Sequence, residues 1–197
     1  MKKILMFLGM LFMLFSFAET SYAAGESAVT MVWVNPAAVS DISSAEQRLN
    51  AGLQEALKKY GFQYADSVQA QVMMQQYMIE NSIVPDDTKT SVGFLPKKAD
   101  MKAFANELGV QYVVFTNARI TDEKVKTAWL SWAGAKYEVT TLFTTIVYSA
   151  DQDRYVFFNQ QAVKENAAGT SSTERAFNKC CDTYFAKKLT SDVLVLK

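Results

Sequence analysis

Few side chains in this sequence are suited to acid–base or nucleophilic chemistry. The 197 residues include no histidine, so Ser-His and Cys-His nucleophile pairs are absent. Carboxylates that could act as an acid and base pair occur at three places: Asp86 with Asp87, Asp122 with Glu123, and Asp151 with Asp153. Each pair falls in a polar turn, where acids are ordinarily solvated. The chain is therefore predicted not to be an enzyme.

The sequence also lacks the residues of the common cofactor and metal sites. It contains neither G-x-G-x-x-G nor G-x-x-x-x-G-K-[ST], the loops that cradle nucleotides. Its only cysteines, Cys180 and Cys181, are neighbours, with Cα atoms about 3.8 Å apart, too close for a relaxed disulfide. They are predicted to be small apolar helix residues, with an intermolecular bridge or metal capture as the alternative. Asp151 and Asp153 offer too few oxygens for calcium, and no cofactor is expected.

One aromatic cluster is suited to binding. The stretch "TAWLSWAGAKYEV", residues 127–139, holds two of the three tryptophans of the chain. An exposed aromatic surface with polar tips could bind a carbohydrate, a small ligand or a protein. The residues predicted to form it are Trp129, Trp132, Lys136 and Tyr137. The alternative is that these side chains cover the end of a sheet.

The N-terminus has the layout of a secretory signal peptide. Lys2 and Lys3 precede an uncharged apolar run from Ile4 to Ala18, which is shorter than the roughly 20 residues of a membrane span. Cleavage after Ala23 places small residues at both peptidase positions. We expect residues 1–23 to be a signal peptide, residues 24–197 to form a single domain without a membrane span, and the product to be periplasmic or extracellular.

The near-neutral charge of the mature chain argues against a surface that binds nucleic acid by electrostatic attraction. Without Lys2, Lys3 and Glu19 it carries 18 basic and 19 acidic side chains, with no long run of either sign. A nucleic-acid surface is therefore not expected.

The elements that must position any site follow from hydrophobic periodicity. Residues 28–34 are apolar and β-rich, and residues 43–60 have helical spacing, with Ser43 and Glu46 at capping-box positions. A short strand is predicted at 62–65 and helices at 67–81 and 101–108. Gly61 and Gly109 stand where helix ends require positive φ.

The second half reads as strands followed by a helix. Residues 110–120 suit a strand buried on both faces, and residues 122–136 break the pattern. Two long β-rich runs joined at Asp151–Asp153 predict an antiparallel hairpin. A helix follows from a second capping box at Ser171 and Glu174, and the last residues are a candidate edge strand. The predicted fold is α/β (α+β), a mixed sheet with packed helices in the order β-α-β-α-α-β-β-β-α-(β).

The stretch "ADMKAFANELGVQYVVFTNARI", residues 99–120, is similar to a known pattern. A helix that ends in E-L-G and runs into V-x-Y-V-V resembles bacterial envelope proteins of the group that includes the TolB N-terminal domain, CsgG and LpoB. The resemblance implies an α/β envelope module that binds other proteins without catalysis. The chain lacks the lipidation cysteine of those lipoproteins and clear additional pore-forming strands like those of CsgG, so pore formation is not expected.

These observations favour an exported, non-enzymatic protein-interaction module of the bacterial cell envelope, in an assembly or accessory role, with an envelope protein as its partner. The alternative is a carbohydrate- or small-ligand-binding protein that uses the loop of Trp129 and Trp132.

Overall fold

The computed structural model describes residues 25–34, 41–82, 95–127, 135–168 and 172–197. Its elements are β1 (Ser27–Val34), α2 (Ile42–Ala56), β2 (Gln63–Tyr64), α3 (Ser67–Glu80), α4 (Lys98–Leu108), β3 (Tyr112–Thr127), β4 (Ala135–Ser149), β5 (Arg154–Ala168) and α5 (Ser172–Thr183). A short 3-10 turn follows α2, and a π-helical turn, Tyr184–Lys188, follows α5. The order of helices and strands confirms the predicted α/β class.

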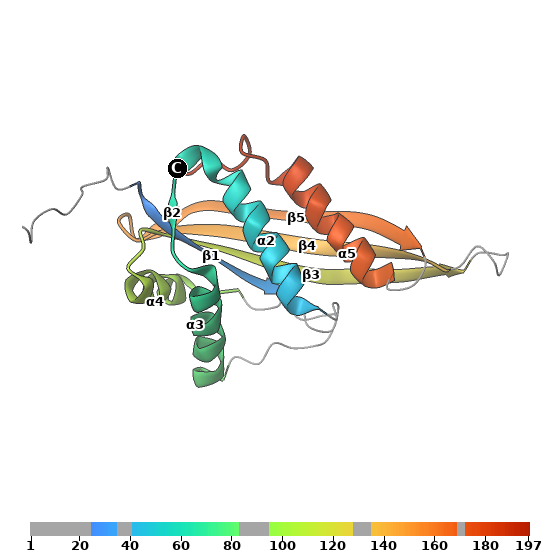
Figure 1. Cartoon of the computed structure of the whole chain (residues 1–197), viewed down its shortest axis with the longest axis horizontal. Coiled ribbons are helices and arrows are strands. Elements are labelled where there is room, and N and C mark those ends of the chain that lie inside the picture. Colours follow the sequence, from blue (N-terminus) through green and yellow to red (C-terminus); the bar gives the residue numbers. More distant parts are fainter. Residues whose placement is uncertain (1–24, 35–40, 83–94, 128–134, 169–171) are drawn as a thin grey trace, which may run out of the picture.

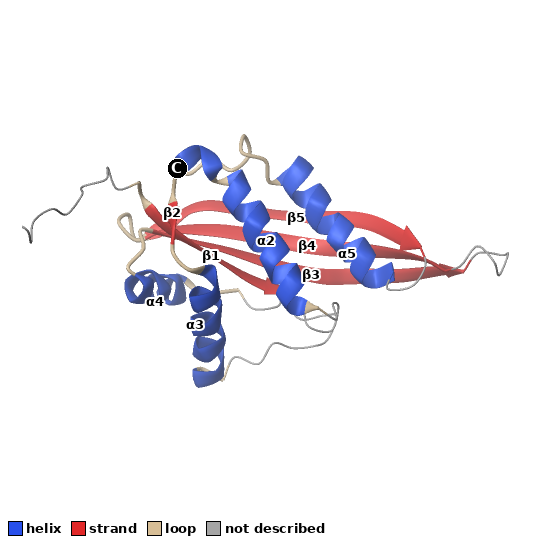
Figure 2. Ribbon diagram, viewed as in Figure 1, coloured by secondary structure: helices blue, strands red, loops and turns tan. Residues whose placement is uncertain are grey.

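The strands form one mixed sheet of five, in the order β2-β1-β3-β4-β5 (Figures 1 and 2). β1 pairs in parallel with β2 and with β3, whereas β3, β4 and β5 form an antiparallel meander. β2 reaches only the first two residues of β1. β5 is the edge strand on the opposite side.

Helices cover the two faces of this sheet unequally. α2 and α5 lie side by side across one face, and α3 and α4 cover part of the other (Figure 1). Alternate residues of β1 enter the two resulting cores, since successive side chains of a strand point to opposite faces. Val32 packs under α2 and α5, and Met31 and Trp33 pack under α3 and α4.

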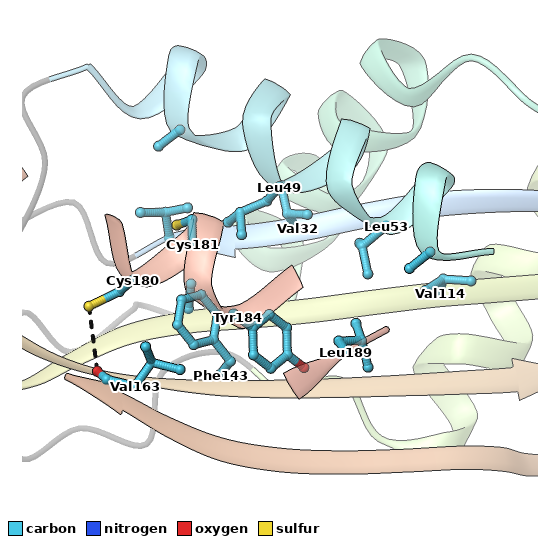
Figure 3. Packing of buried hydrophobic residues seen from close by; sticks show 14 of the residues in the cluster. Val32, Leu49, Leu53, Val114, Phe143, Val163, Cys180, Cys181, Tyr184 and Leu189 are labelled. Carbon is cyan, nitrogen blue, oxygen red and sulfur yellow. Dashed lines mark hydrogen bonds between the residues drawn. The ribbon is translucent and has the colours of Figure 1, made fainter. Parts of the chain in front are cut away.

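The larger core is centred on Tyr184, at the end of α5 (Figure 3). Its ring stacks on Phe143 of β4 with centroids 4.3 Å apart. Cys180 and Cys181 are fully buried, unbridged members of the same cluster, which confirms their predicted place in the core. The Cys180 thiol lies 3.4 Å from the Val163 carbonyl oxygen. Burial raises the pKa of both thiols, so neither is a reactive thiolate.

Both predicted helix-ending glycines have the expected conformation. Gly61 has φ of 64° and Gly109 has φ of 62°, in the left-handed region that a side chain would strain. The predicted hairpin is also present, since β4 ends at Ser149 and β5 begins at Arg154.

The cap of α2 differs from the prediction. The side chain of Asp41, and not that of Ser43, accepts a hydrogen bond from the backbone N–H of Ser44, at 3.0 Å. The cap therefore lies two residues before the predicted one, and the helix begins at Ile42. Glu46 is left out of the cap, and its carboxylate accepts a hydrogen bond from Gln71 of α3.

The described parts of the segment 122–136 are more regular than the sequence indicates. β3 continues to Thr127 and β4 begins at Ala135, and the two strands stay paired to their ends. Lys124 lies opposite Glu138, a pair of opposite charges across the ladder. Only a register shift between Ile120 and Asp122 marks the break in pattern. The periodicity is lost because the end of the hairpin has no fully buried face.

The predicted edge strand at the C-terminus is absent. A turn at 191–193 precedes the tail, which makes one backbone hydrogen bond to β5, from the Lys197 N–H to the Val156 carbonyl at 3.1 Å. The hydroxyl of Tyr60 also holds the tail, accepting a hydrogen bond from the Leu196 N–H at 2.9 Å. A side chain therefore fixes the tail where a ladder was expected.

Candidate functional site

The predicted aromatic site lies only partly in the described structure. Trp129 and Trp132 lie outside the described residues. Lys136 is exposed and Tyr137 is half-buried at the start of β4, where neighbours on a strand point to opposite faces. The structure therefore does not bring Lys136 and Tyr137 onto one surface. The site remains a prediction.

The hairpin acid Asp153 has a structural role. Its carboxylate accepts a hydrogen bond from the Tyr148 hydroxyl at 2.7 Å and lies 3.1 Å from Lys98 Nζ and 3.5 Å from Lys102 Nζ. The Tyr148 hydrogen bond and these ammonium groups lower the pKa of Asp153 to about 2. The acid is thereby held ionised and fastens the β4–β5 turn to α4.

The acids after the β3 register shift also have local partners. Asp122 pairs with Lys124 at 2.9 Å, and Glu123 accepts a hydrogen bond from Thr173 at 2.5 Å. The pair Asp86 and Asp87 lies outside the described residues. Within the described ranges, no group of three or more Asp, Glu, Cys or His residues could hold a metal ion.

A polar cleft with a volume of about 290 Å³ lies between α2 and α3. Its lining consists of hydroxyl, amide and carboxyl side chains with a few small apolar ones: Ser43, Glu46, Gln47, Asn50, Ala51, Gln54, Ser67, Val68, Gln71, Val72 and Gln75. We call this the α2–α3 cleft.

The floor of the α2–α3 cleft is built on the outer edge of β1. β2 leaves that edge open after its first residues, and Gln71 of α3 takes the place of a strand. Its Nε2 donates to the Val32 carbonyl at 2.8 Å, and its Oε1 accepts from the Val32 N–H at 3.3 Å. The amide thus reproduces the pairing of a neighbouring backbone. Gln54 makes a similar contact from α2, donating to Thr30 Oγ1 at 3.3 Å.

Two side chains of the cleft are unusual: one has a shifted pKa, and the other has a buried oxygen without a hydrogen bond to another described residue. Glu46 Oε1 accepts a hydrogen bond from Gln71 Nε2 at 2.9 Å, but burial raises the pKa of Glu46 to about 7. Asn50 Oδ1 is buried and has no hydrogen-bond partner among the residues that the structure describes.

α3 also presents an apolar surface to solvent beside the cleft. Val68 is 70% exposed, Val72 50% and Ile79 78%. Their spacing places them on one side of the helix, away from the buried face of Ala70, Met74 and Met78, which the sequence predicts as core. We call these three side chains the α3 stripe.

On the other side of α3 lies a second cleft, against α4, of about 300 Å³. Met73, Tyr77 and Phe104 give it an apolar floor, and Glu80 and Glu107 stand on its lining. α3 therefore lies between two hollows with exposed apolar side chains along its outer surface.

The sequence contained one signal for this site. Residues 67–80 carry apolar side chains at two separate helical phases, one through Met74 and one through Val72. A helix with one packed face needs only one of them, so the second phase marks a contact surface. The pairing of Gln71 with Val32 has no local signal, since 39 positions separate the two residues.

No protein-family model matches the chain, and no curated protein matches it in sequence. Among solved structures it is similar to the hypothetical protein CT253 from Chlamydia trachomatis, with 10% identity and a TM-score of 0.39 over 82% of this chain and 96% of that one. It is similar to lipoprotein GNA1162 from Neisseria meningitidis, with 8% identity and a TM-score of 0.36 over 82% and 96%. The LpoB C-terminal domain from Escherichia coli matches with 15% identity and a TM-score of 0.36 over 77% and 92%.

LpoB belongs to the group of envelope proteins that residues 99–120 resemble in sequence. In the described part of the chain, no helix is both long and apolar enough to cross a membrane.

Proposed function

We propose that this chain is an exported, non-enzymatic module of the bacterial cell envelope that binds another protein through α3, in an assembly or accessory role. The observation that carries the proposal is the α3 stripe, exposed on a helix whose opposite face is already packed. Exposed apolar side chains gathered on one element, beside polar hollows, are typical of a contact surface.

The chemistry around the α3 stripe specifies the partner. Its surface should carry apolar side chains for Val68, Val72 and Ile79, and hydrogen-bonding groups for the amide and hydroxyl side chains that line the α2–α3 cleft. A polypeptide surface supplies both. The absence of histidine and the ordinary contacts of the hairpin acids support a role without catalysis. The signal-peptide layout of residues 1–23 supports export.

The test combines substitution with cross-linking. Val68→Gln with Ile79→Gln is expected to reduce capture of the partner at least tenfold, because apolar contact is lost, and to leave Tm within about 2 °C, because both side chains are already exposed. A photo-cross-linking residue in place of Val72 should give one discrete adduct in the native envelope fraction, and the double substitution should abolish it.

The matched control is Val193→Gln with Val195→Gln, which removes two valines, each 44% exposed, from the C-terminal tail. Capture should be unchanged in this variant. Equal loss of capture in both variants, or unchanged capture in the α3 variant, would refute the proposal.

The alternative is a carbohydrate or small-ligand site at Trp129, Trp132, Lys136 and Tyr137. Its support is the clustering of these aromatic and cationic side chains in the sequence.

A further inference from the structure

β5 is an edge strand with one side of its backbone paired and the other open. It bonds to β4 along its length. α5 packs on one face of β5, and its C-terminal end projects beyond that strand in the view of Figure 1. Such an edge is a template for another strand unless the protein covers it.

The outward direction of the backbone groups follows from two hydrogen bonds. The carbonyl oxygens of Asn166 and Ala168 accept hydrogen bonds from Lys179 Nζ and Arg175 Nη1, each at 3.0 Å. Because backbone groups alternate along a strand, the even-numbered residues from Phe158 to Ala168 point outward. Val156 stands at the register shift of the β4–β5 ladder, and its carbonyl oxygen accepts a hydrogen bond from Lys197 N at 3.1 Å.

The open part of the edge is therefore limited at both ends. Lys197 occupies it at Val156, and Lys179 occupies it at Asn166. Between these two contacts, which we call plugs, the outward backbone N–H and C=O groups belong to Phe158, Gln160, Ala162 and Lys164. None of these groups is bonded to another described residue of the chain. We call this segment the β5 edge. Its seven residues span about 23 Å at roughly 3.3 Å per residue.

The surroundings of the β5 edge define what fits it. Phe158 is 62% exposed beside it, on the sheet face away from α2 and α5. Arg175 and Lys179 bond to backbone carbonyls at its Asn166 end, and those contacts do not neutralise their charge. Lys164 pairs with Glu138 at 2.8 Å. The edge is thus apolar near one end and flanked by cations at the other.

A second copy of the chain fits this edge poorly. The 15 residues of another β5 would run past the open segment and meet the plug at Lys197 or at Lys179. A short segment ends, or turns away, before reaching either plug. We propose that the β5 edge binds an extended peptide, with a β-branched centre and acidic ends, as a sixth strand. This site is separate from the α3 stripe.

The experiment uses the mature chain and a fluorescein-labelled peptide of sequence Glu-Thr-Val-Thr-Val-Thr-Glu. Ala162→Pro removes an outward N–H and places a ring on the edge, and it leaves the bonds to β4 intact because that N–H does not point to β4. By fluorescence anisotropy, Ala162→Pro is expected to weaken binding at least tenfold. Ala162→Val, which keeps the N–H, should stay within twofold of the unsubstituted chain. Circular dichroism and Tm establish that both variants fold.

A pair of modified peptides tests backbone pairing directly. N-methylation at the Thr positions and N-methylation at the Val positions block opposite edges of the probe. One peptide should bind and the other should not. Equal binding of both, or unchanged binding by Ala162→Pro, would overturn the proposal. A concentration-dependent dimer that Ala162→Pro dissociates would also overturn it, by assigning the edge to a second copy.

Discussion

At the scale of single residues, Glu46 shows how a tertiary contact replaces a local one. Its position three residues after Ser43 is that of a capping box, yet Asp41 makes the cap. Glu46 instead meets the amide of Gln71, which holds the open edge of β1. Burial raises the pKa of this carboxyl to about 7, although the Gln71 hydrogen bond by itself lowers it.

Glu46 should make stability depend on pH in a defined direction. A raised pKa means that the folded chain binds a proton more tightly than the unfolded chain, so stability falls as pH rises from about 4.5 to about 7 and is then level. Glu46→Gln removes that loss. With allowance for solvent screening of a half-buried group, we expect a gain of about 1 kcal/mol at pH 8, or roughly 2–4 °C in Tm, and none at pH 4.

The control for Glu46 is Glu55→Gln on the same helix, where the side chain is exposed and contacts only Lys58. Thermal melts from pH 4 to pH 8 compare the three proteins. A Glu46→Gln curve parallel to that of the unsubstituted chain would show that the carboxyl is solvated.

At the scale of elements, the close packing of α2 on the end of α5 depends on a glycine inside a helix. A methyl group at Gly52 would lie 2.4 Å from two ring atoms of Phe185, and 2.8 Å from a third. Glycine is less favourable than alanine inside a helix by roughly 1 kcal/mol. The helix has glycine here because any side chain would overlap the ring of Phe185.

Gly52→Ala is expected to destabilise the fold by about 1–3 kcal/mol, measured by urea denaturation, because the whole ring of Phe185 must shift. In a chain that also carries Phe185→Leu, the same change should be neutral or stabilising. If Gly52→Ala stabilises the otherwise unsubstituted chain, the ring is not held in place.

At the scale of the whole molecule, the unequal covering of the sheet separates the proposed binding surfaces. α3 lies beside the β1 edge, and the open part of β5 lies at the other edge of the sheet (Figure 1). The tryptophan segment follows β3 in the sequence. Changes at one surface should therefore leave the other two intact.

Replacing Trp129 and Trp132 together with Ala tests this independence. Secretion and Tm are expected to stay unchanged, and binding of carbohydrate, measured by calorimetry, to be lost if the predicted platform exists. Capture of the α3 partner should persist. A fall in Tm of many degrees would instead mean that the indole rings belong to the core.

What the sequence determined by itself is the element order and the ends marked by local chemistry. Gly61 and Gly109 end their helices because positive φ disfavours a side chain, and the apolar runs at 28–34 and 110–120 demand burial on both faces. These signals depend on residues that are close in the sequence, so they can be recognised from the sequence alone.

Only the tertiary structure decided where polar groups find partners. Gln71 reaches Val32 across 39 positions, and Arg48 reaches Asp182 across 134. The same holds for the edges: β3 continues past Ile120 because β4 pairs with it, and the tail forms no strand because Tyr60 holds it. Such choices depend on which backbone groups the assembled sheet leaves unpaired, and no local pattern encodes that.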